Sequence, residues 1–94
     1  SLFLQGSGDA DEKLSPAEER AIKKQKEAQE RRTARERERL ERMIAALEEE
    51  IEELQGEMCK EENLTNPKRL MELDEKVKSR QKELELVYDK WMNL

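Results

Sequence analysis

The chain has 94 residues, of which 46% are charged, 34% hydrophobic and 3% aromatic, and its formal net charge is −5. This composition excludes an ordinary globular core and leaves a choice between disorder and long helices. The absence of His and the single Cys exclude a Cys/His zinc site and a disulfide within the chain, and no apolar run approaches the ~20 residues that span a bilayer.

Residues 1–14 show no apolar periodicity and contain two of the three glycines. We expect them to be a disordered tag or linker. The next four residues, Ser15 to Glu18, are typical of a helix start, with Ser as the N-cap, Pro at the first helical position and Glu closing a capping box. The charged residues that follow predict a basic helical arm or linker over residues 15–39.

Residues 40–94 are predicted to form an antiparallel coiled-coil hairpin with its turn at about residues 61–67. Asn66 and Pro67 repeat the helix-start signal, so the second helix should run from Pro67 to near Trp91 or the last residue. The fold class is therefore all-α: a two-helix antiparallel coiled-coil hairpin with a longer, basic N-terminal helix extension.

Apolar residues recur in both segments at alternating intervals of three and four, which is the pattern of a left-handed coiled-coil seam. The seam of the first helix consists of Leu40, Ile44, Leu47, Ile51, Leu54 and Met58. That of the second consists of Leu70, Leu73, Val77, Arg80, Leu84, Val87, Trp91 and Leu94. A turn centred near Leu64 pairs Met58 with Leu70, Ile51 with Val77, Ile44 with Leu84, and Leu40 with Val87 and Tyr88.

Three residues near the seam need separate interpretations. Arg80 occupies a core position, and we expect its head group to pair with Glu48. Cys59 should be a small, buried or half-buried hydrophobic residue rather than a reactive thiol. Trp91 is expected to close the open end of the hairpin, with a cation–π contact to Arg37.

Charge divides the chain into a basic and an acidic part. Residues 16–39 hold nine basic and six acidic side chains, whereas residues 40–94 hold nine basic and fifteen acidic ones. Three pairs have the spacing of helical ion pairs. They are Glu19–Lys23, Glu27–Arg31 and Glu38–Arg42, the last of which joins the basic part to the acidic part.

Basic residues that repeat along one helix face, without an apolar stripe, favour a polyanion such as nucleic acid lying along them. No aromatic residue lies among them, so contacts should be to the phosphate backbone and not sequence-specific. The candidate nucleic-acid-binding residues are Arg20, Lys23, Lys24, Lys26, Arg31, Arg32, Arg35, Arg39 and Arg42.

Three segments of the chain are distinctive: KLSPAEER at the start, LEEEIEELQGEMC before the turn, and LELVYDKWMNL at the end, with Leu84, Tyr88 and Trp91 in an L-x-x-x-Y-x-x-W arrangement. Together they resemble the C-terminal coiled-coil domain of the ABC-F subfamily of ATP-binding-cassette ATPases. The resemblance covers about residues 12–94. The loop from Lys60 to Pro67 departs from the family, which often has Asp-Pro just after the Cys.

The resemblance implies a cytoplasmic protein whose relatives act on ribosomes as translation or antibiotic-resistance factors, and whose C-terminal domain in some members binds DNA. The implied partners are DNA, ribosomal RNA or the ribosome, with no membrane. ATP and Mg²⁺ are expected only for the parent protein, because the chain has no G-x-x-x-x-G-K-[ST] motif and no LSGGQ-like signature. We therefore predict no catalytic, cofactor-binding or metal-binding residue and no enzymatic activity for this chain.

Two alternatives remain open from the residues alone. The chain can instead be a structural spacer or an oligomerisation coiled coil that binds no nucleic acid. Alternatively, the basic segment can be a solvated helix or a disordered linker that happens to be rich in arginine. We expect a monomer with at most weak self-association.

Overall fold

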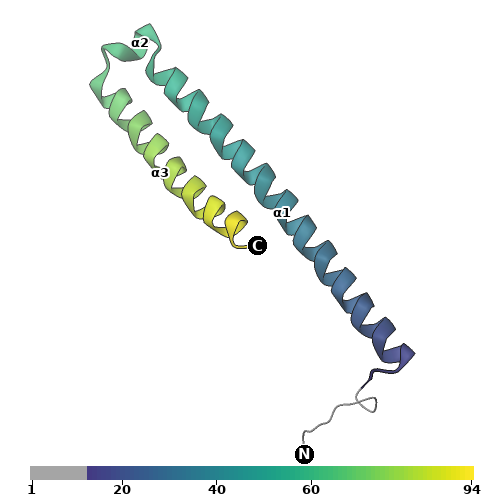
Figure 1. Ribbon diagram of the computed structural model, residues 1–94. Coiled ribbons are helices and arrows are strands. Elements are labelled where there is room, and N and C mark those ends of the chain that lie inside the picture. The colour runs from purple at the N-terminus through teal and green to yellow at the C-terminus, as the bar shows by residue number, and fades with distance from the viewer. Residues whose placement is uncertain (1–12) are drawn as a thin grey trace, which may run out of the picture. The chain divides into compact units, whose positions relative to one another are not determined.

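The computed structural model describes residues 13–94 (Figure 1). In this part of the chain the helices are α1 (Pro16–Met58), α2 (Glu61–Leu64) and α3 (Pro67–Met92). The chain divides into two compact units between Arg32 and Thr33. The interpretation of residues 1–14 as a tag or linker falls mostly on residues 1–12, which lie outside the described residues.

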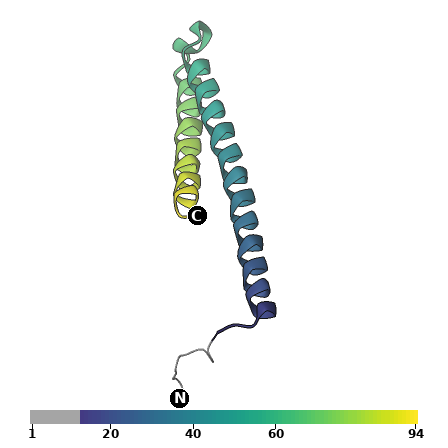
Figure 2. The same cartoon turned by 45° about the vertical axis from the view of Figure 1, so that its right-hand side comes forward.

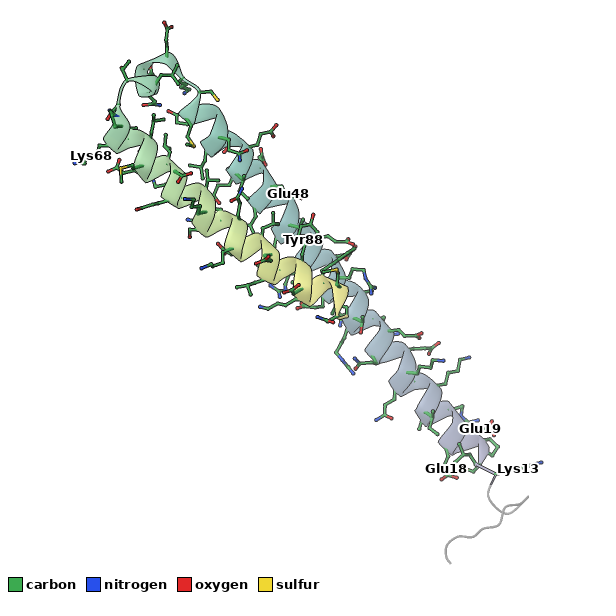
Figure 3. The ribbon with its side chains drawn as sticks, turned by 60° about the vertical axis from the view of Figure 1, so that its left-hand side comes forward. Lys13, Glu18, Glu19, Glu48, Lys68 and Tyr88 are labelled. Carbon is green, nitrogen blue, oxygen red and sulfur yellow. The ribbon has the colours of Figure 1, made fainter. Side chains whose placement is uncertain are left out.

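The start of α1 is fixed by the predicted capping box. The Glu18 backbone N–H donates to the Ser15 hydroxyl at 3.1 Å, and the Ser15 backbone N–H donates to the Glu18 carboxylate at 2.9 Å. That backbone donor lowers the pKa of Glu18 below its usual value. Figure 3 labels Glu18 and Glu19 in this first turn, where acidic side chains also favour the positive end of the helix dipole.

The start of α3 follows the same chemistry. The side-chain oxygen of Asn66 accepts the Arg69 backbone N–H at 3.1 Å, and Pro67 occupies the first turn, where its missing N–H costs nothing. The predicted start at Pro67 is confirmed. The helix ends at Met92, one residue beyond Trp91.

Within the unit of residues 33–94, α3 runs antiparallel to the C-terminal part of α1 (Figures 1 and 2). The fold is all-α, as predicted, and α1 has 43 residues against 26 in α3. The buried apolar core consists of Leu40, Ile44, Leu47 and Ile51 from α1 and Leu73, Val77 and Val87 from α3.

The predicted seam is confirmed apart from its last residue. Leu54, Met58, Leu70, Leu84 and Trp91 are half-buried at seam positions. In contrast, Leu94 is 42% exposed, so its assignment to the seam was wrong. The reason is that α3 ends two residues earlier, and the last residue no longer follows the helical repeat.

One cluster of the core bears on the predicted pairing. It joins Leu40, Ile44 and Leu47 to Val87, and Leu84 and Tyr88 pack against it. The cluster thus contains both members of the pairs Ile44–Leu84 and Leu40–Val87, which the heptad arithmetic set opposite each other.

The turn contains a feature that the sequence did not predict. The short helix α2 lies between the two long helices, and its Asn63 is buried at 7% exposure. The Asn63 side-chain amide donates to the Glu57 carbonyl at 2.8 Å, so this carbonyl in the last turn of α1 has a second donor beside the Lys60 backbone N–H at 3.2 Å. Asn63 therefore ties the turn to the end of α1.

Candidate nucleic-acid interface

The candidate binding residues all lie on α1 and all are exposed. The unit that ends at Arg32 holds Arg20, Lys23, Lys24, Lys26, Arg31 and Arg32. The unit of residues 33–94 holds Arg35, Arg39 and Arg42. Their role in binding stays a prediction.

Among these nine residues, Arg39 has an ion-pair partner in the described part of the chain. Its Nε and Nη2 donate to the two carboxylate oxygens of Glu36, each at 2.8 Å. This bidentate pair raises the pKa of Arg39 and lowers that of Glu36. Arg32 instead donates to the neutral side chain of Gln29 at 2.7 Å, so its charge is not neutralised.

The three predicted ion pairs at i,i+4 are absent from the described residues. The pairs Glu19–Lys23, Glu27–Arg31 and Glu38–Arg42 do not come within the 4.0 Å that defines an ion pair, so this prediction was wrong. An exposed pair on a helix contributes only a few tenths of a kcal/mol, which does not outweigh the entropy of two long side chains. The cations of this helix are therefore mostly left to solvent.

Around the first turns of α1, three cations line a shallow surface hollow. Arg20, Lys23 and Lys24 surround it, with Ala17 and Ala21 as its small residues and Glu27 at its edge. The short alanine side chains leave room between the long basic ones. Chemically, this surface offers several ammonium and guanidinium donors to one anionic group.

Arg80 lies at the seam but pairs with a different carboxylate from the one predicted. Its Nε donates to Glu50 at 3.0 Å, and its Nη1 lies 3.5 Å from Glu83. The Glu50 hydrogen bond raises the pKa of Arg80. The expected partner, Glu48, accepts the Tyr88 hydroxyl instead, so the Arg80–Glu48 prediction was wrong.

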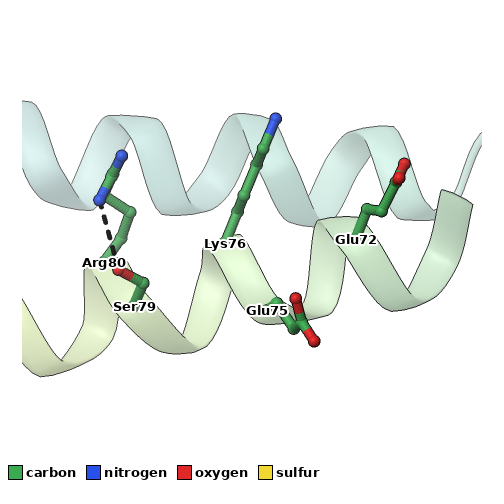
Figure 4. Close-up of a pocket in the computed structure, with 5 residues that line it drawn as sticks. All are labelled: Glu72, Glu75, Lys76, Ser79 and Arg80. Carbon is green, nitrogen blue, oxygen red and sulfur yellow. Dashed lines mark hydrogen bonds between the residues drawn. The ribbon is translucent and has the colours of Figure 1, made fainter.

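Arg80 also contributes to a small surface hollow on α3. Figure 4 shows its guanidinium bonded to the Ser79 hydroxyl, with Glu72, Glu75 and Lys76 as the other lining residues. The Nη1–Oγ distance is 3.4 Å. The guanidinium of Arg80 is already held by Glu50 and Glu83, so among the residues that line this hollow Lys76 is the cation without an ion pair within residues 13–94.

Trp91 and Tyr88 close the open end of the hairpin by packing and hydrogen bonding. Both pack against the core cluster around Leu40, and their rings meet edge to face, with centroids 6.4 Å apart at 84°. The Trp91 indole N–H donates to Glu41 at 3.0 Å. The expected cation–π contact with Arg37 does not occur in this described region; the indole uses a carboxylate instead.

Cys59 is exposed, so the prediction of a buried or half-buried side chain was wrong. The cause is local, since α1 ends at Met58 and the next residue has left the helical repeat. The described residues contain no group of three or more His, Cys, Asp or Glu side chains that could hold a metal ion. No helix within residues 13–94 is long and apolar enough to cross a membrane.

The class of protein that this fold defines is a helical hairpin, in which α3 packs against the C-terminal part of α1. Residues 28–94 match the family described as the ABC transporter C-terminal domain, and the chain belongs to this family. It is typical of ABC-F ATPases, which confirms the family that the sequence segments indicated, although the match starts later than residue 12. No curated protein matches the chain, and no solved structure does so either.

Proposed function

We propose that this chain is a non-catalytic module that binds the phosphate backbone of nucleic acid through the basic side chains of α1. The observation that carries the proposal is that seven of the nine candidate residues are exposed and make neither an ion pair nor a side-chain hydrogen bond within the described residues. Those seven are Arg20, Lys23, Lys24, Lys26, Arg31, Arg35 and Arg42. An exposed cation without a partner keeps its full charge for a ligand.

The spacing of these residues suits a regular polyanion. Residues four apart on a helix lie about one turn, or 5.4 Å, apart along its axis, and phosphates recur at a comparable spacing along a nucleic-acid strand. Arg35 and Arg39 follow this spacing, and guanidinium groups bind phosphate oxygens bidentately. Counterion release then supplies most of the affinity.

The aromatic residues do not offer stacking surfaces for bases. Trp91 and Tyr88 are half-buried against the hairpin core and bonded to Glu41 and Glu48. Since phosphate contacts position a protein but do not read sequence, we expect binding that does not depend on base sequence. The same chemistry serves DNA and ribosomal RNA.

The test is a fluorescence anisotropy titration with a labelled DNA duplex and an RNA duplex at increasing salt. We expect affinity for both duplexes and a decrease by roughly 10-fold or more between about 50 and 200 mM salt. The variant Arg31→Gln/Arg35→Gln/Arg39→Gln should bind more weakly and with a smaller salt slope.

The matched control removes the same charge from α3 through Lys68→Gln/Lys76→Gln/Lys82→Gln. These three lysines are exposed and form no ion pair within the described residues. Binding should change little in this control. Equal losses in the two triple variants, or no binding at low salt, would contradict the proposal.

The parent protein is proposed to be an ABC-F ATPase that acts on ribosomes, with this chain as its contact to nucleic acid. Support comes from the family match over residues 28–94. The coding sequence on the N-terminal side of this segment tests the first part directly. Two nucleotide-binding cassettes with G-x-x-x-x-G-K-[ST] motifs are expected there, and their absence would remove the parent ATPase from the proposal.

A further inference from the structure

The face of α1 that points away from the hairpin seam has a second, self-complementary pattern. In a coiled coil, residues alternately three and four apart stay on one side of the helix. On the side opposite the core residues Leu40, Ile44 and Leu47, this repeat selects Arg35, Arg39, Arg42, Ala46, Glu49 and Glu53. All six are exposed, and all belong to the unit of residues 33–94.

The charges on this face change sign at its middle. Three arginines precede Ala46 and two glutamates follow it. Glu49 and Glu53 form no ion pair or side-chain hydrogen bond in the described part of the chain, and the same is true of Arg35 and Arg42. The face thus presents opposite charges that cannot meet each other, because they lie along one rigid helix.

We propose that this face binds a second copy of the chain, with the two α1 helices antiparallel around a two-fold axis near residue 44. The basic half of each α1 face then lies opposite the acidic half of the other. Arg35 lies opposite Glu53 of the second copy, and Arg39 lies opposite Glu49. A two-fold axis repeats each contact, so both pairs form twice.

The side chains at the centre allow the helices to approach. Ala46 lies opposite Arg42 of the second copy, and the neighbouring Ala45 is also small and exposed. Small residues permit close helix contact, while the arginine stem covers them. The guanidinium of Arg39 is paired with Glu36. An exposed ion pair of this kind contributes little free energy, so Arg39 can exchange Glu36 for a glutamate of the second copy at little cost.

The association should be weak and sensitive to salt. Exposed ion pairs contribute little each, and the face has no large apolar residue, so we expect a dissociation constant on the order of 100 µM at low ionic strength. Glu38 lies at the edge of the face and reduces its positive charge. The dimer also covers Arg35, Arg39 and Arg42, so nucleic acid and a second copy compete for these arginines if the proposed function holds.

Sedimentation equilibrium at about 20 mM salt, where screening is weak, tests the proposal with two complementary variants. Arg35→Glu/Arg39→Glu carries four glutamates at the paired positions, and Glu49→Arg/Glu53→Arg carries four arginines. Each variant alone should be monomeric, and an equimolar mixture should form a heterodimer. Circular dichroism shows that both variants keep the helical hairpin.

The control is the charge-inverted variant, which combines all four substitutions. It has the net charge of the original chain and restores every proposed pair with reversed polarity, so it should dimerise again. Nucleic-acid binding is measured separately on the Arg35→Glu/Arg39→Glu variant, which loses two arginines and gains none, so the outcome for the proposed function does not depend on whether the inverted variant dimerises. A monomeric inverted variant, or an original chain that stays monomeric at low salt, would overturn the inference.

The native Cys59 tests the orientation of the two copies. With an axis near residue 44, spin labels on the two Cys59 side chains should lie about 45 Å apart along α1, at 1.5 Å per residue. A parallel arrangement in register brings the two labels close together instead. A short distance in a sample shown to be dimeric would contradict the antiparallel pairing.

Discussion

The hydroxyl of Tyr88 on α3 donates a hydrogen bond of 2.7 Å to the carboxylate of Glu48 on α1. Figure 3 shows the two side chains labelled on the neighbouring helices. The contact links the two helices through residues that are 40 positions apart in the sequence. The neighbouring aromatic residue on α3, Trp91, is half-buried. The contact also places a negative charge next to a phenol that must remain protonated to donate.

The first prediction concerns the ionisation of Tyr88. Its hydrogen bond to Glu48, together with desolvation and the carboxylate charge, raises the pKa of Tyr88 above its usual value. Since Tyr88 is the single tyrosine of the chain, its absorbance at high pH reports this group alone. The titration midpoint should lie above that of the unfolded chain, and Glu48→Ala should shift it down.

The sign of the linked stability effect follows from this shift. A folded-state pKa above the unfolded one means that the stabilisation is complete below the unfolded pKa, about 10, and is lost as pH rises through the folded pKa. The midpoint temperature of thermal unfolding should therefore decrease from pH 8 to 11, and Tyr88→Phe should reduce this decrease, to which Lys60 and Lys78 contribute through their own raised pKa values. An unchanged decrease in this variant would assign it to other groups.

The second prediction concerns Trp91 as a packing residue. Its ring packs against the core cluster and donates to Glu41, so Trp91→Ala should lower the free energy of unfolding by roughly 1–3 kcal/mol, less than for a fully buried Trp. Urea denaturation followed by circular dichroism measures this loss. Unchanged stability combined with lost nucleic-acid binding would instead make Trp91 a stacking residue.

The seam was predictable because the heptad repeat sets which backbone positions face each other. It could not set the polar contacts, because Glu48, Glu49 and Glu50 are consecutive and long donors reach any of several carboxylates. The hydroxyl of Tyr88 takes Glu48, which leaves Glu50 to Arg80. Such choices depend on side-chain conformers, which sequence spacing does not encode.

The candidate interface was predictable in its exposure but not in its ion pairs. Basic residues without an apolar stripe have nothing to bury, so the exposure of residues such as Arg35 followed from composition alone. The ion pair of Arg39 with Glu36 could not be predicted in the same way. Helical ion pairs at the i,i+3 and i,i+4 spacings differ in free energy by only tenths of a kcal/mol. The contact of the Asn63 amide in the turn could not be predicted either, because a single side-chain contact leaves no periodic pattern in the sequence.

The third prediction compares two neighbouring positions of α3. Leu73 is 1% exposed, whereas Met71 is 66% exposed. Leu73→Ala removes buried methyl groups and leaves a cavity, so it should lower the free energy of unfolding by about 2–4 kcal/mol. Met71→Ala is the matched control and should change it by less than about 0.5 kcal/mol. Similar losses in chemical denaturation would contradict the packing of α3.

The fourth prediction concerns the amide of Asn63 in the turn. Asn63→Ala removes the 2.8 Å donor of the part-buried Glu57 carbonyl and leaves it the 3.2 Å bond from the Lys60 backbone N–H, so the loss should be that of one hydrogen bond, about 0.5–1.5 kcal/mol. Asn93→Ala removes a bond of the same type, from an exposed side-chain amide to the Asp89 carbonyl. Water replaces that donor, so the control should be nearly neutral. Equal effects of the two substitutions in thermal unfolding would show that Asn63 does not hold the turn.

The last prediction concerns Gly56 near the end of α1. A Cβ atom added at Gly56 would meet no heavy atom within 4 Å, and its backbone does not have a positive φ. Alanine therefore fits without strain and restricts the unfolded chain, so Gly56→Ala should raise the free energy of unfolding by roughly 0.5–1 kcal/mol. Amide hydrogen exchange should slow most in the last turns of α1, because the substitution stiffens the helix locally. A loss of stability would mean that the turn after Met58 needs the flexibility of glycine.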